Sequence, residues 1–222
     1  MELSDVMRTT ASVRAFTAEP VDPADLYRVL DDARFAGSGG NQQGWHVTIV
    51  RDLELRRRLA DLSAANWKRY LAEQAAGYRA FNPIERAPAD IPMSDDLPRH
   101  PMLEGIEQVP ELLVVTVDLR VLAVTDCDLD RFSIVGGASI YPFVQNILLA
   151  ARNLALGSVL TTFLAASEPE AGPLIALPEH HAIVAMIGLG HPVHQPTKLT
   201  RKPVESFTTI DGIDGRAFTP DG

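Results

Sequence analysis

Apolar residues recur at helical spacing in two segments of the first third of the chain. Asp22 followed by Pro23 is typical of a helix N-cap and first turn, and the apolar positions after them predict a helix from about Pro23 to Ala36. A glycine loop ends this helix. A second helix is predicted from Leu53 to about Ala76, in a segment rich in Arg, Leu and Ala. The segment from Gly37 to Asp52 is therefore predicted to lie between two helices.

Four shorter segments have the patterns of strands. Apolar and polar residues alternate in Trp45–Val50, as they do in a half-buried strand. Leu112–Val117 is rich in β-branched residues and apolar throughout except for one threonine, which predicts a strand buried on both faces. Val159–Phe163, with two threonines, and the apolar run Ile183–Leu189 are also expected to form strands. The chain is therefore predicted to contain both helices and strands.

One predicted helix, from Ile134 to Ala155, is apolar on nearly every side. Such a helix belongs in the middle of a structure, and we expect it to pack against its copy in an intertwined homodimer. The overlapping stretch Phe132–Ala151 is uncharged over a length that spans a bilayer, but glycines and polar residues dilute it. We therefore expect no membrane segment. A short helix is predicted at Glu168–Ala176.

Two segments are rich in proline. Six prolines between Asn82 and Pro110 exclude long helices there, and a connection of this length is either a lid over a site or a mobile excursion. We favour a lid or insertion at about 78–110. From about 196 to 222 the chain has few apolar clusters, which predicts an extended C-terminal arm ordered by a partner surface. The prediction is one domain over residues 1–222.

Composition and charge narrow the functional classes. The chain has 222 residues, of which 46% are hydrophobic and 22% charged, as in ordinary folded domains. A formal net charge of −9 with scattered basic residues argues against a nucleic-acid surface. Cys127 is the single cysteine, so no internal disulfide forms, and the first ten residues lack the apolar run of a signal peptide. These features predict a cytoplasmic protein.

Several familiar motifs fail on inspection. Asp126, Asp128 and Asp130 begin like a calcium loop, but Arg131 stands where glycine is needed, so we expect a solvated acidic turn. The histidines lack the additional ligands of a zinc site, and no metal is expected. The glycines around Ser139 lack the spacing of a nucleophile elbow, and those at the end of the last strand lack the spacing of a dinucleotide fingerprint.

Three separate segments together suit a planar, phosphorylated cofactor. The loop from Gly37 to Trp45 combines glycines, which allow close backbone approach, with hydroxyl and amide side chains. Arg8–Arg14 sets two cations beside three hydroxyls, a combination that can bind a phosphate. Arg201 and Lys202 in the C-terminal arm provide further phosphate donors.

The order of these motifs resembles that of the nitroreductase family of flavoproteins along nearly the whole chain. The matching segments, in chain order, are Ser12-Val13-Arg14-Ala15-Phe16, Pro20-Val21, Ala36 to Trp45, the helix leading to Leu156-Gly157 and Thr161-Thr162, Leu189-Gly190-His191-Pro192, and Arg201-Lys202-Pro203. The chain departs from the pattern at Thr10, where the family has arginine. It departs again at Gly37 and Gly44, where the family has proline.

The resemblance implies a nitroreductase-like α+β fold, with a central, mostly antiparallel sheet flanked by helices. It also implies an intertwined homodimer and bound FMN, with NADPH or NADH as reductant. It implies phosphate contacts from Ser12, Arg14 and Arg201, with Arg8 and Thr10 beside them. The loop of the neighbouring subunit would line the flavin, and the end of a later strand would approach its ring. The residues implied there are Ser38, Gly39, Asn41, Gln43, Leu160, Thr161 and Thr162. Arg99 and His100 are candidates for further flavin contacts that lack a clear match.

The resemblance also implies an FMN-dependent oxidoreductase that passes hydride from NAD(P)H to a small electron-poor substrate, such as a nitroaromatic or quinone. FMN supplies this chemistry, so no catalytic acid or base is required of the side chains. Trp45, Phe132 and Tyr141 are expected to wall the substrate cleft. Two alternatives remain: an enzyme of the same fold that dehalogenates or desaturates a specific metabolite, and a flavin-binding or storage protein without turnover.

Overall fold

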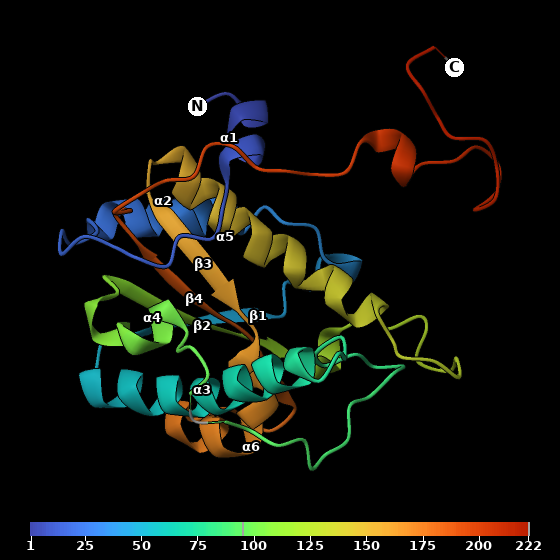
Figure 1. Ribbon diagram of the computed structural model, residues 1–222. Coiled ribbons are helices and arrows are strands. Elements are labelled where there is room, and N and C mark those ends of the chain that lie inside the picture. Colours follow the sequence, from blue (N-terminus) through green and yellow to red (C-terminus); the bar gives the residue numbers. More distant parts are fainter. Residues whose placement is uncertain (95, 222) are drawn as a thin grey trace.

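The computed structural model describes residues 1–94 and 96–221 and contains a four-stranded antiparallel sheet between two layers of helices (Figure 1). The strands are β1 (Trp45–Val50), β2 (Glu111–Asp118), β3 (Gly157–Thr161) and β4 (His181–Gly190), in the order β1-β2-β4-β3 across the sheet. All three pairings are antiparallel, with an irregularity in the register at Val115 and Thr116. The predicted α+β class and all four predicted strands are confirmed.

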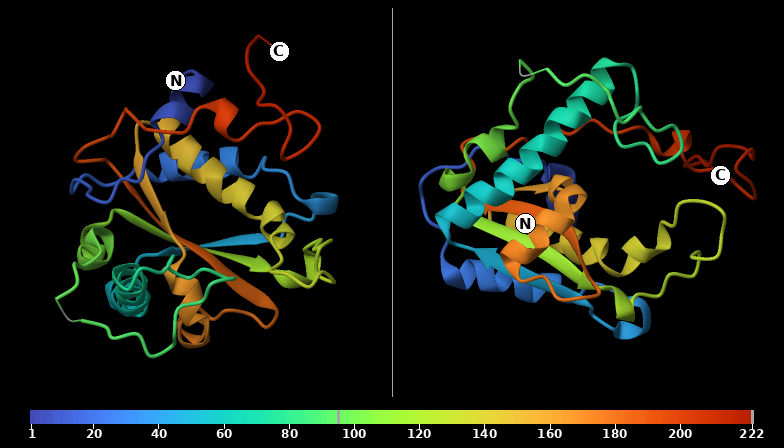
Figure 2. Two further views of the ribbon diagram at one scale, coloured as in Figure 1. Left: turned by 45° about the vertical axis from the view of Figure 1, so that its right-hand side comes forward. Right: turned by 90° about the horizontal axis from the view of Figure 1, so that it is seen from below.

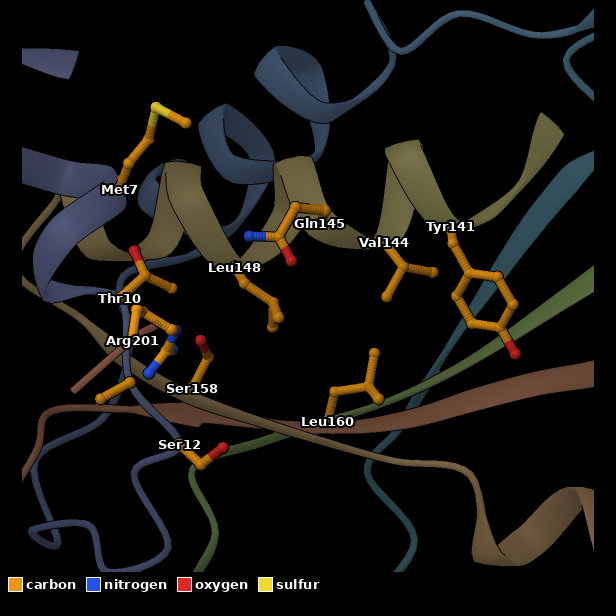
Figure 3. Close-up of a pocket in the computed structure, with 11 residues that line it drawn as sticks. Met7, Thr10, Ser12, Tyr141, Val144, Gln145, Leu148, Ser158, Leu160 and Arg201 are labelled. Carbon is orange, nitrogen blue, oxygen red and sulfur yellow. The ribbon is translucent and has the colours of Figure 1, made fainter. Parts of the chain in front are cut away.

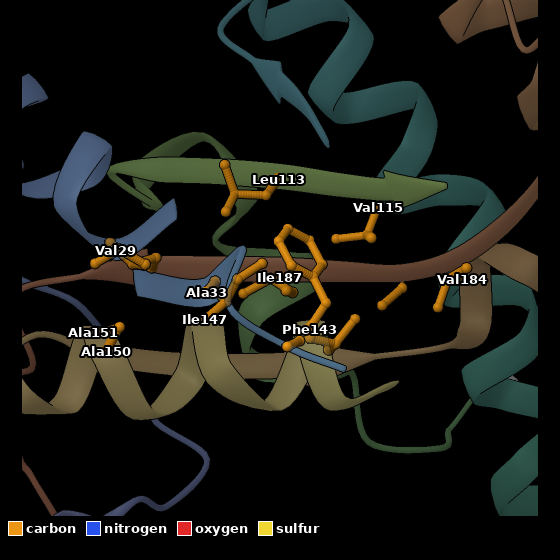
Figure 4. Packing of buried hydrophobic residues seen from close by; sticks show 14 of the residues in the cluster. Val29, Ala33, Leu113, Val115, Phe143, Ile147, Ala150, Ala151, Val184 and Ile187 are labelled. Carbon is orange, nitrogen blue, oxygen red and sulfur yellow. The ribbon is translucent and has the colours of Figure 1, made fainter. Parts of the chain in front are cut away.

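Strand β2 has buried side chains on both faces, as its apolar sequence predicted. Leu113 and Val115 point into the core cluster beneath α2 (Pro23–Ala33) and α5 (Tyr141–Asn153), which Figure 4 shows from close by. Leu112 and Val114 point into a second cluster on the other face. That face is covered by α3 (Leu53–Ala75), α4 (Pro101–Glu104) and α6 (Glu168–Ala171), which lie on the opposite side of the sheet from α5 in both views of Figure 2. The central strands thus hold the two helical layers together.

The helices α2 and α3 begin where the sequence predicted. The Asp22 carboxylate accepts a hydrogen bond of 2.8 Å from the Ala24 N–H, and the Asp52 carboxylate accepts one of 2.7 Å from Leu55 N–H. Each of these bonds satisfies a backbone donor that has no partner within the helix. Helix α2 ends at Ala33, three residues earlier than predicted.

The prediction of one long helix from Ile134 to Ala155 was wrong. The helix α5 starts only at Tyr141, and Val135–Ser139 forms the separate 3-10 turn η4. Glycine has low helix propensity, and Gly136 and Gly137 lie in this turn. Pro142 then lies in the first turn of α5, which is the helical position proline prefers. The predicted helix at Glu168–Ala176 is similarly split, because α6 gives way at Gly172 to the 3-10 turn η6 (Gly172–Ile175).

The two proline-rich segments have different structures. Residues 78–94 and 96–100 contain no helix or strand, whereas Met102 and Ile106, in the short turns that follow, are buried in the second core cluster. The predicted lid includes Asp95 and the predicted arm includes Gly222, and both residues lie outside the described part. The arm leaves β4 at its end, passes α1 (Leu3–Thr9) and then extends away from the body of the protein (Figure 1).

The loop before η4 is organised by a buried carboxylate. Asp126 is 4% exposed and accepts hydrogen bonds from the Ser133 hydroxyl at 2.7 Å, from Arg131 at 2.7 Å and from Ile134 N–H at 3.1 Å. The Ser133 hydrogen bond is the largest cause of a strongly lowered Asp126 pKa. The prediction of a solvated acidic turn was therefore wrong for this aspartate.

The described residues contain neither a membrane-spanning helix nor a cluster of metal-ligating side chains. Every helix within 1–94 and 96–221 is too short or too polar to cross a membrane. The same residues contain no group of three His, Cys, Asp or Glu side chains arranged to hold a metal ion.

Candidate functional site

A hollow of about 540 Å³ lies between α5 and the edge strand β3, and we call it the α5–β3 hollow (Figure 3). Its volume is within the range of about 300–1,000 Å³ that small-molecule sites occupy. It combines an apolar wall from α5 and β3 with hydroxyl groups and a guanidinium group at one end. Its lining residues are Met7, Thr10, Ala11, Ser12, Tyr141, Val144, Gln145, Leu148, Ser158, Leu160 and Arg201.

The chain after α1 enters this hollow by pairing with β3. Ser12 forms a parallel bridge with Ser158, and Val13 N–H donates a hydrogen bond of 2.8 Å to the Ser158 carbonyl. A Cβ at Gly157 would lie 2.8 Å from Val13 Cγ1, so glycine is needed for this close approach. Thr10 also lines the hollow, with its hydroxyl donating to the Val6 carbonyl at the end of α1. The pairing explains how Ser12 joins the site.

Arg201 reaches the same hollow from the C-terminal arm. Its guanidinium donates to the Thr200 carbonyl at 2.8 Å, and no carboxylate pairs with it within residues 1–94 and 96–221. In Figure 3 the Arg201 side chain lies beside Thr10, Ser12 and Ser158. An unpaired guanidinium next to hydroxyl groups is suited to bind a phosphate through charge-assisted hydrogen bonds. The structure therefore brings together Ser12 and Arg201, which the sequence had linked only by analogy.

The other predicted phosphate residues lie elsewhere. Arg8 does not line the α5–β3 hollow but an adjacent, larger one, described below. Arg14 is exposed, and its charge acts on His100 at the start of α4. Burial first, and Arg14 second, lower the pKa of His100, so its imidazole is neutral at neutral pH. His100 is 6% exposed and its Nδ1 has no hydrogen-bond partner among the described residues.

His100 belongs to an aromatic cluster near the end of β3. Its ring makes edge contacts with Trp67, at 5.1 Å between ring centroids, and with Phe163, at 6.3 Å. Tyr70 completes the group by stacking on Trp67 at 5.5 Å. The sequence indicated His100 only by its position before the middle strand. For the other members of the cluster, the available signal was the spacing of Trp67 and Tyr70, which lie three residues apart on α3.

The residues at the end of β3, Leu160, Thr161 and Thr162, have different surroundings. Leu160 lines the α5–β3 hollow. Thr161 is 5% exposed, and its hydroxyl accepts a hydrogen bond of 3.3 Å from Phe163 N–H. Thr162 is the residue before the 3-10 turn η5 (Phe163–Ser167). Within a single chain, Leu160 is the residue of this segment that lines the hollow, so it is the one placed to contact a cofactor there.

The glycine loop lies outside the α5–β3 hollow of its own chain, so Ser38, Gly39, Asn41 and Gln43 do not line it. Gly39 N–H donates to the Ser139 hydroxyl at 2.9 Å, and the Gln43 side chain donates to Asn41 Oδ1 at 3.2 Å. Asn41 and Gln43 have left-handed backbones, with φ of 54° and 50°. Such backbone conformations are uncommon and concentrate at functional sites.

Gly44, the last glycine of the loop, faces the chain after β2. A Cβ at this position would lie 2.5 Å from Val121 Cγ2. Val121 therefore occupies the space that a larger residue at position 44 would need.

The three predicted substrate residues have different environments. Tyr141 lines the α5–β3 hollow and is 46% exposed. Phe132 is 57% exposed on the loop held by Asp126. Trp45 stacks on Phe143 with ring centroids 4.7 Å apart and packs against the core beneath α5.

One side of α5 supplies wall residues that the sequence did not identify, namely Val144, Gln145 and Leu148. The signal was their spacing with Tyr141 at i, i+3, i+4 and i+7.

Comparison with known proteins decides the family. The sequence model of the nitroreductase family matches residues 7–191. The chain belongs to the nitroreductase family. The predicted resemblance is therefore confirmed, and the pairing of Ser12 with Ser158 and the α5–β3 hollow lie within the matched residues, with Arg201 beyond them in the arm.

Two curated relatives show how similar this chain is to known proteins. An NADPH-flavin oxidoreductase of Vibrio harveyi is 27% identical over 192 residues, which are 86% of this chain and 66% of the relative. The chain thus spans just under two thirds of that relative. An NADH dehydrogenase of Thermus thermophilus is 27% identical over 194 residues, covering 87% of this chain and 88% of the relative.

Solved structures confirm the nitroreductase fold. An NADPH:FMN oxidoreductase from Vibrio harveyi, complexed with NAD⁺, matches with a TM-score of 0.66 at 20% identity, over 99% of this chain and 80% of that one. An iodotyrosine deiodinase bound to FMN and 3-iodo-L-tyrosine matches with a TM-score of 0.65 at 21% identity, over 91% of this chain and 96% of that one.

Proposed function

We propose that this nitroreductase-family protein is an FMN-dependent oxidoreductase that passes hydride from NADPH or NADH to a small electron-poor substrate, such as a nitroaromatic or quinone. The observation that carries the proposal is the meeting of Ser12, Ser158 and Arg201 in one hollow beside an apolar wall. A phosphorylated, planar group needs both features. The names of the Vibrio harveyi relative and of the structure with bound FMN support the same cofactor.

The residues present fit FMN. Arg201 would hold the phosphate, because its guanidinium lacks a carboxylate partner in the described part of the chain. Ser12 would donate a hydroxyl hydrogen bond there, whereas the Thr10 hydroxyl beside it already donates to the Val6 carbonyl. Val144 and Leu160 would pack against the planar ring and exclude water from one side of it.

FMN, when bound, accepts hydride from the reduced nicotinamide and gives it up to the substrate. The side chains then have the tasks of binding and orientation, since the hollow contains no aspartate, glutamate, histidine or lysine among its lining residues. Tyr141 at the opening of the hollow would contact the molecule that enters. Substrate choice would depend on such wall residues, with Phe132 and Trp45 as further candidates.

A homodimer would complete the site. The arm exposes apolar residues that a single chain leaves uncovered, including Phe207 at 69% and Ile213 at 101% exposure. An arm extended away from its own body, as in Figure 1, is suited to lie across a second copy. We propose that the loop with Ser38 and Asn41 then reaches the flavin of the other subunit, and that residues 78–100 act as a lid.

Bound-flavin absorbance followed by anaerobic reduction tests the proposal. We expect the purified protein to be yellow, or to become so with added FMN, and its flavin absorbance to bleach within seconds after NADPH or NADH is added. A colourless protein that takes up no FMN would overturn the cofactor assignment. Bound flavin that neither reductant bleaches would favour a storage protein instead.

One specific observation favours a narrower activity. The structure of iodotyrosine deiodinase matches this chain with a TM-score of 0.65, so the fold accommodates dehalogenation of a defined metabolite. If reduced protein is reoxidised by halogenated aromatic metabolites but not by nitroaromatics or quinones, this alternative is the better description.

A further inference from the structure

A second hollow, of about 1250 Å³, lies between α1 and the C-terminal arm, and we call it the α1–arm hollow. It shares Met7 and Arg201 with the α5–β3 hollow, so the two lie side by side. The arm is held beside α1 because the Gln195 side chain donates a hydrogen bond of 3.0 Å to the Thr9 carbonyl. The lining residues are Leu3, Ser4, Met7, Arg8, Thr197, Lys198, Leu199, Arg201 and Phe207.

The charged residues of this hollow are all cations. Arg8, Lys198 and Arg201 line it, and none of the three pairs with a carboxylate in residues 1–94 and 96–221. The Arg8 side chain donates a hydrogen bond of 3.3 Å to the Ser4 hydroxyl. Elsewhere in the chain, arginines such as Arg57 and Arg120 are paired with carboxylates at 2.5 and 2.7 Å.

This grouping is notable because the whole chain carries a net charge of −9. Cations that face one hollow repel one another, and a bound anion relieves that repulsion. Arg201 is the cation that both hollows share, and in the proposed function it holds the FMN phosphate. Arg8 and Lys198 then remain for a second anionic group.

We propose that Arg8 and Lys198 bind the 2′-phosphate of NADPH and thereby select NADPH over NADH. This inference rests on the proposed function. A phosphomonoester carries close to two negative charges at neutral pH and three acceptor oxygens, which suits two unpaired cations. Leu3, Met7 and Leu199 supply apolar surface of the kind that an adenine ring contacts. Because the hollows adjoin at Met7 and Arg201, a dinucleotide whose nicotinamide lies over the flavin in the first can place its 2′-phosphate in the second.

Binding of nucleotide fragments to the FMN-loaded protein tests this assignment without turnover. By isothermal calorimetry, 2′,5′-ADP is expected to bind about tenfold more tightly than 5′-AMP, and inorganic phosphate to compete weakly. Arg8→Gln or Lys198→Gln is expected to weaken 2′,5′-ADP binding about threefold each, and the double variant to remove the tenfold difference from 5′-AMP. Lys202→Gln, an exposed cation that lines neither hollow, is the control and is expected to change nothing.

Steady-state rates provide the second measurement. The ratio of kcat/KM for NADPH to that for NADH is expected to fall about threefold in each single variant and about tenfold in the double variant, with the NADH value unchanged. Equal binding of 2′,5′-ADP and 5′-AMP by the unaltered protein would overturn the inference, as would equal losses with both reductants. If the protein binds no FMN, the proposed function fails, while fragment binding still decides whether Arg8 and Lys198 recognise the 2′-phosphate.

Discussion

Val13 N–H donates a hydrogen bond of 2.8 Å to the carbonyl oxygen of Ser158, and this bond joins the start of the chain to the edge strand β3. Because of it, the Ser12 hydroxyl lies in the wall of the α5–β3 hollow, where the arm adds Arg201. The proposed phosphate site thus depends on three segments that are distant in sequence.

Replacing Arg201 by alanine is expected to weaken FMN binding about ten- to a hundredfold, because a hydrogen bond to a charged group contributes roughly 1.5–3 kcal/mol. Fluorescence quenching of FMN on titration with the protein measures the affinity. Lys202→Ala is the matched control, since it removes a neighbouring cation that does not line the hollow. Unchanged FMN affinity in Arg201→Ala would refute the assignment.

Glu73 joins the end of α3 to the segment that we propose as a lid. Its carboxylate is 2% exposed and accepts hydrogen bonds from Arg69 at 2.7 Å and from Phe81 N–H at 2.6 Å. Glu73→Ala leaves the Phe81 N–H without its partner, so the free energy of unfolding should fall by about 1–3 kcal/mol. Urea denaturation followed by circular dichroism measures it. Glu85→Ala, at an exposed position, should have little effect, and equal effects of the two changes would contradict this account.

His100 should make stability depend on pH. Burial, with Arg14 adding to it, lowers the folded-state pKa of His100, whereas the unfolded chain titrates near the ordinary value of about 6.5. Between these two values the unfolded state binds more protons, so stability falls as the pH decreases through about 6.5. The loss of unfolding free energy between about pH 7.5 and about pH 5.5 should therefore be smaller in His100→Gln than in the unaltered protein.

The control for this measurement is His194→Gln, at an exposed histidine in the arm. It should retain the pH dependence of the unaltered protein. A pH dependence that His100→Gln leaves intact would show that other groups cause it.

The exposed arm predicts a dimer in solution. Sedimentation at micromolar protein concentration should give twice the mass of the chain, since Phe207 and Ile213 need a covering surface. Phe207→Asp together with Ile213→Asp should shift the equilibrium toward monomers. A monomeric mass for the unaltered protein would count against the dimer and against a site shared between subunits.

The sequence predicted the elements with strong periodicity and missed what depends on tertiary contacts. The helix α3 and the strand β1 have nearly the predicted ends, because N-caps and alternation are local signals. The environment of Asp126 is not local in this sense, since its burial follows from how Arg131 and Ser133 fold back on it. The long-helix prediction failed because an apolar composition does not reveal where a glycine pair interrupts a helix.

The candidate site shows the same division. Ser12 and Arg201 were predicted from motif order, and the structure brings them into one hollow. The sequence grouped Arg14 with them, but its charge acts on His100 instead, and the chain after the Ser12–Ser158 bridge is not a regular strand whose period would fix where Arg14 points. The unpaired cations of the α1–arm hollow could not be predicted, since pairing depends on which carboxylates lie nearby in space.

The contact between Gly44 and Val121 has a consequence for the evolution of this chain. Because a Cβ at position 44 would come within 2.5 Å of Val121 Cγ2, any residue larger than glycine at position 44 requires Val121 to shift or to be replaced. Substitutions at the two sites should therefore be compensatory: a lineage that acquires a bulkier residue at position 44 should first have lost the valine at 121. The order in which mutations were accepted would then be constrained by one shared volume.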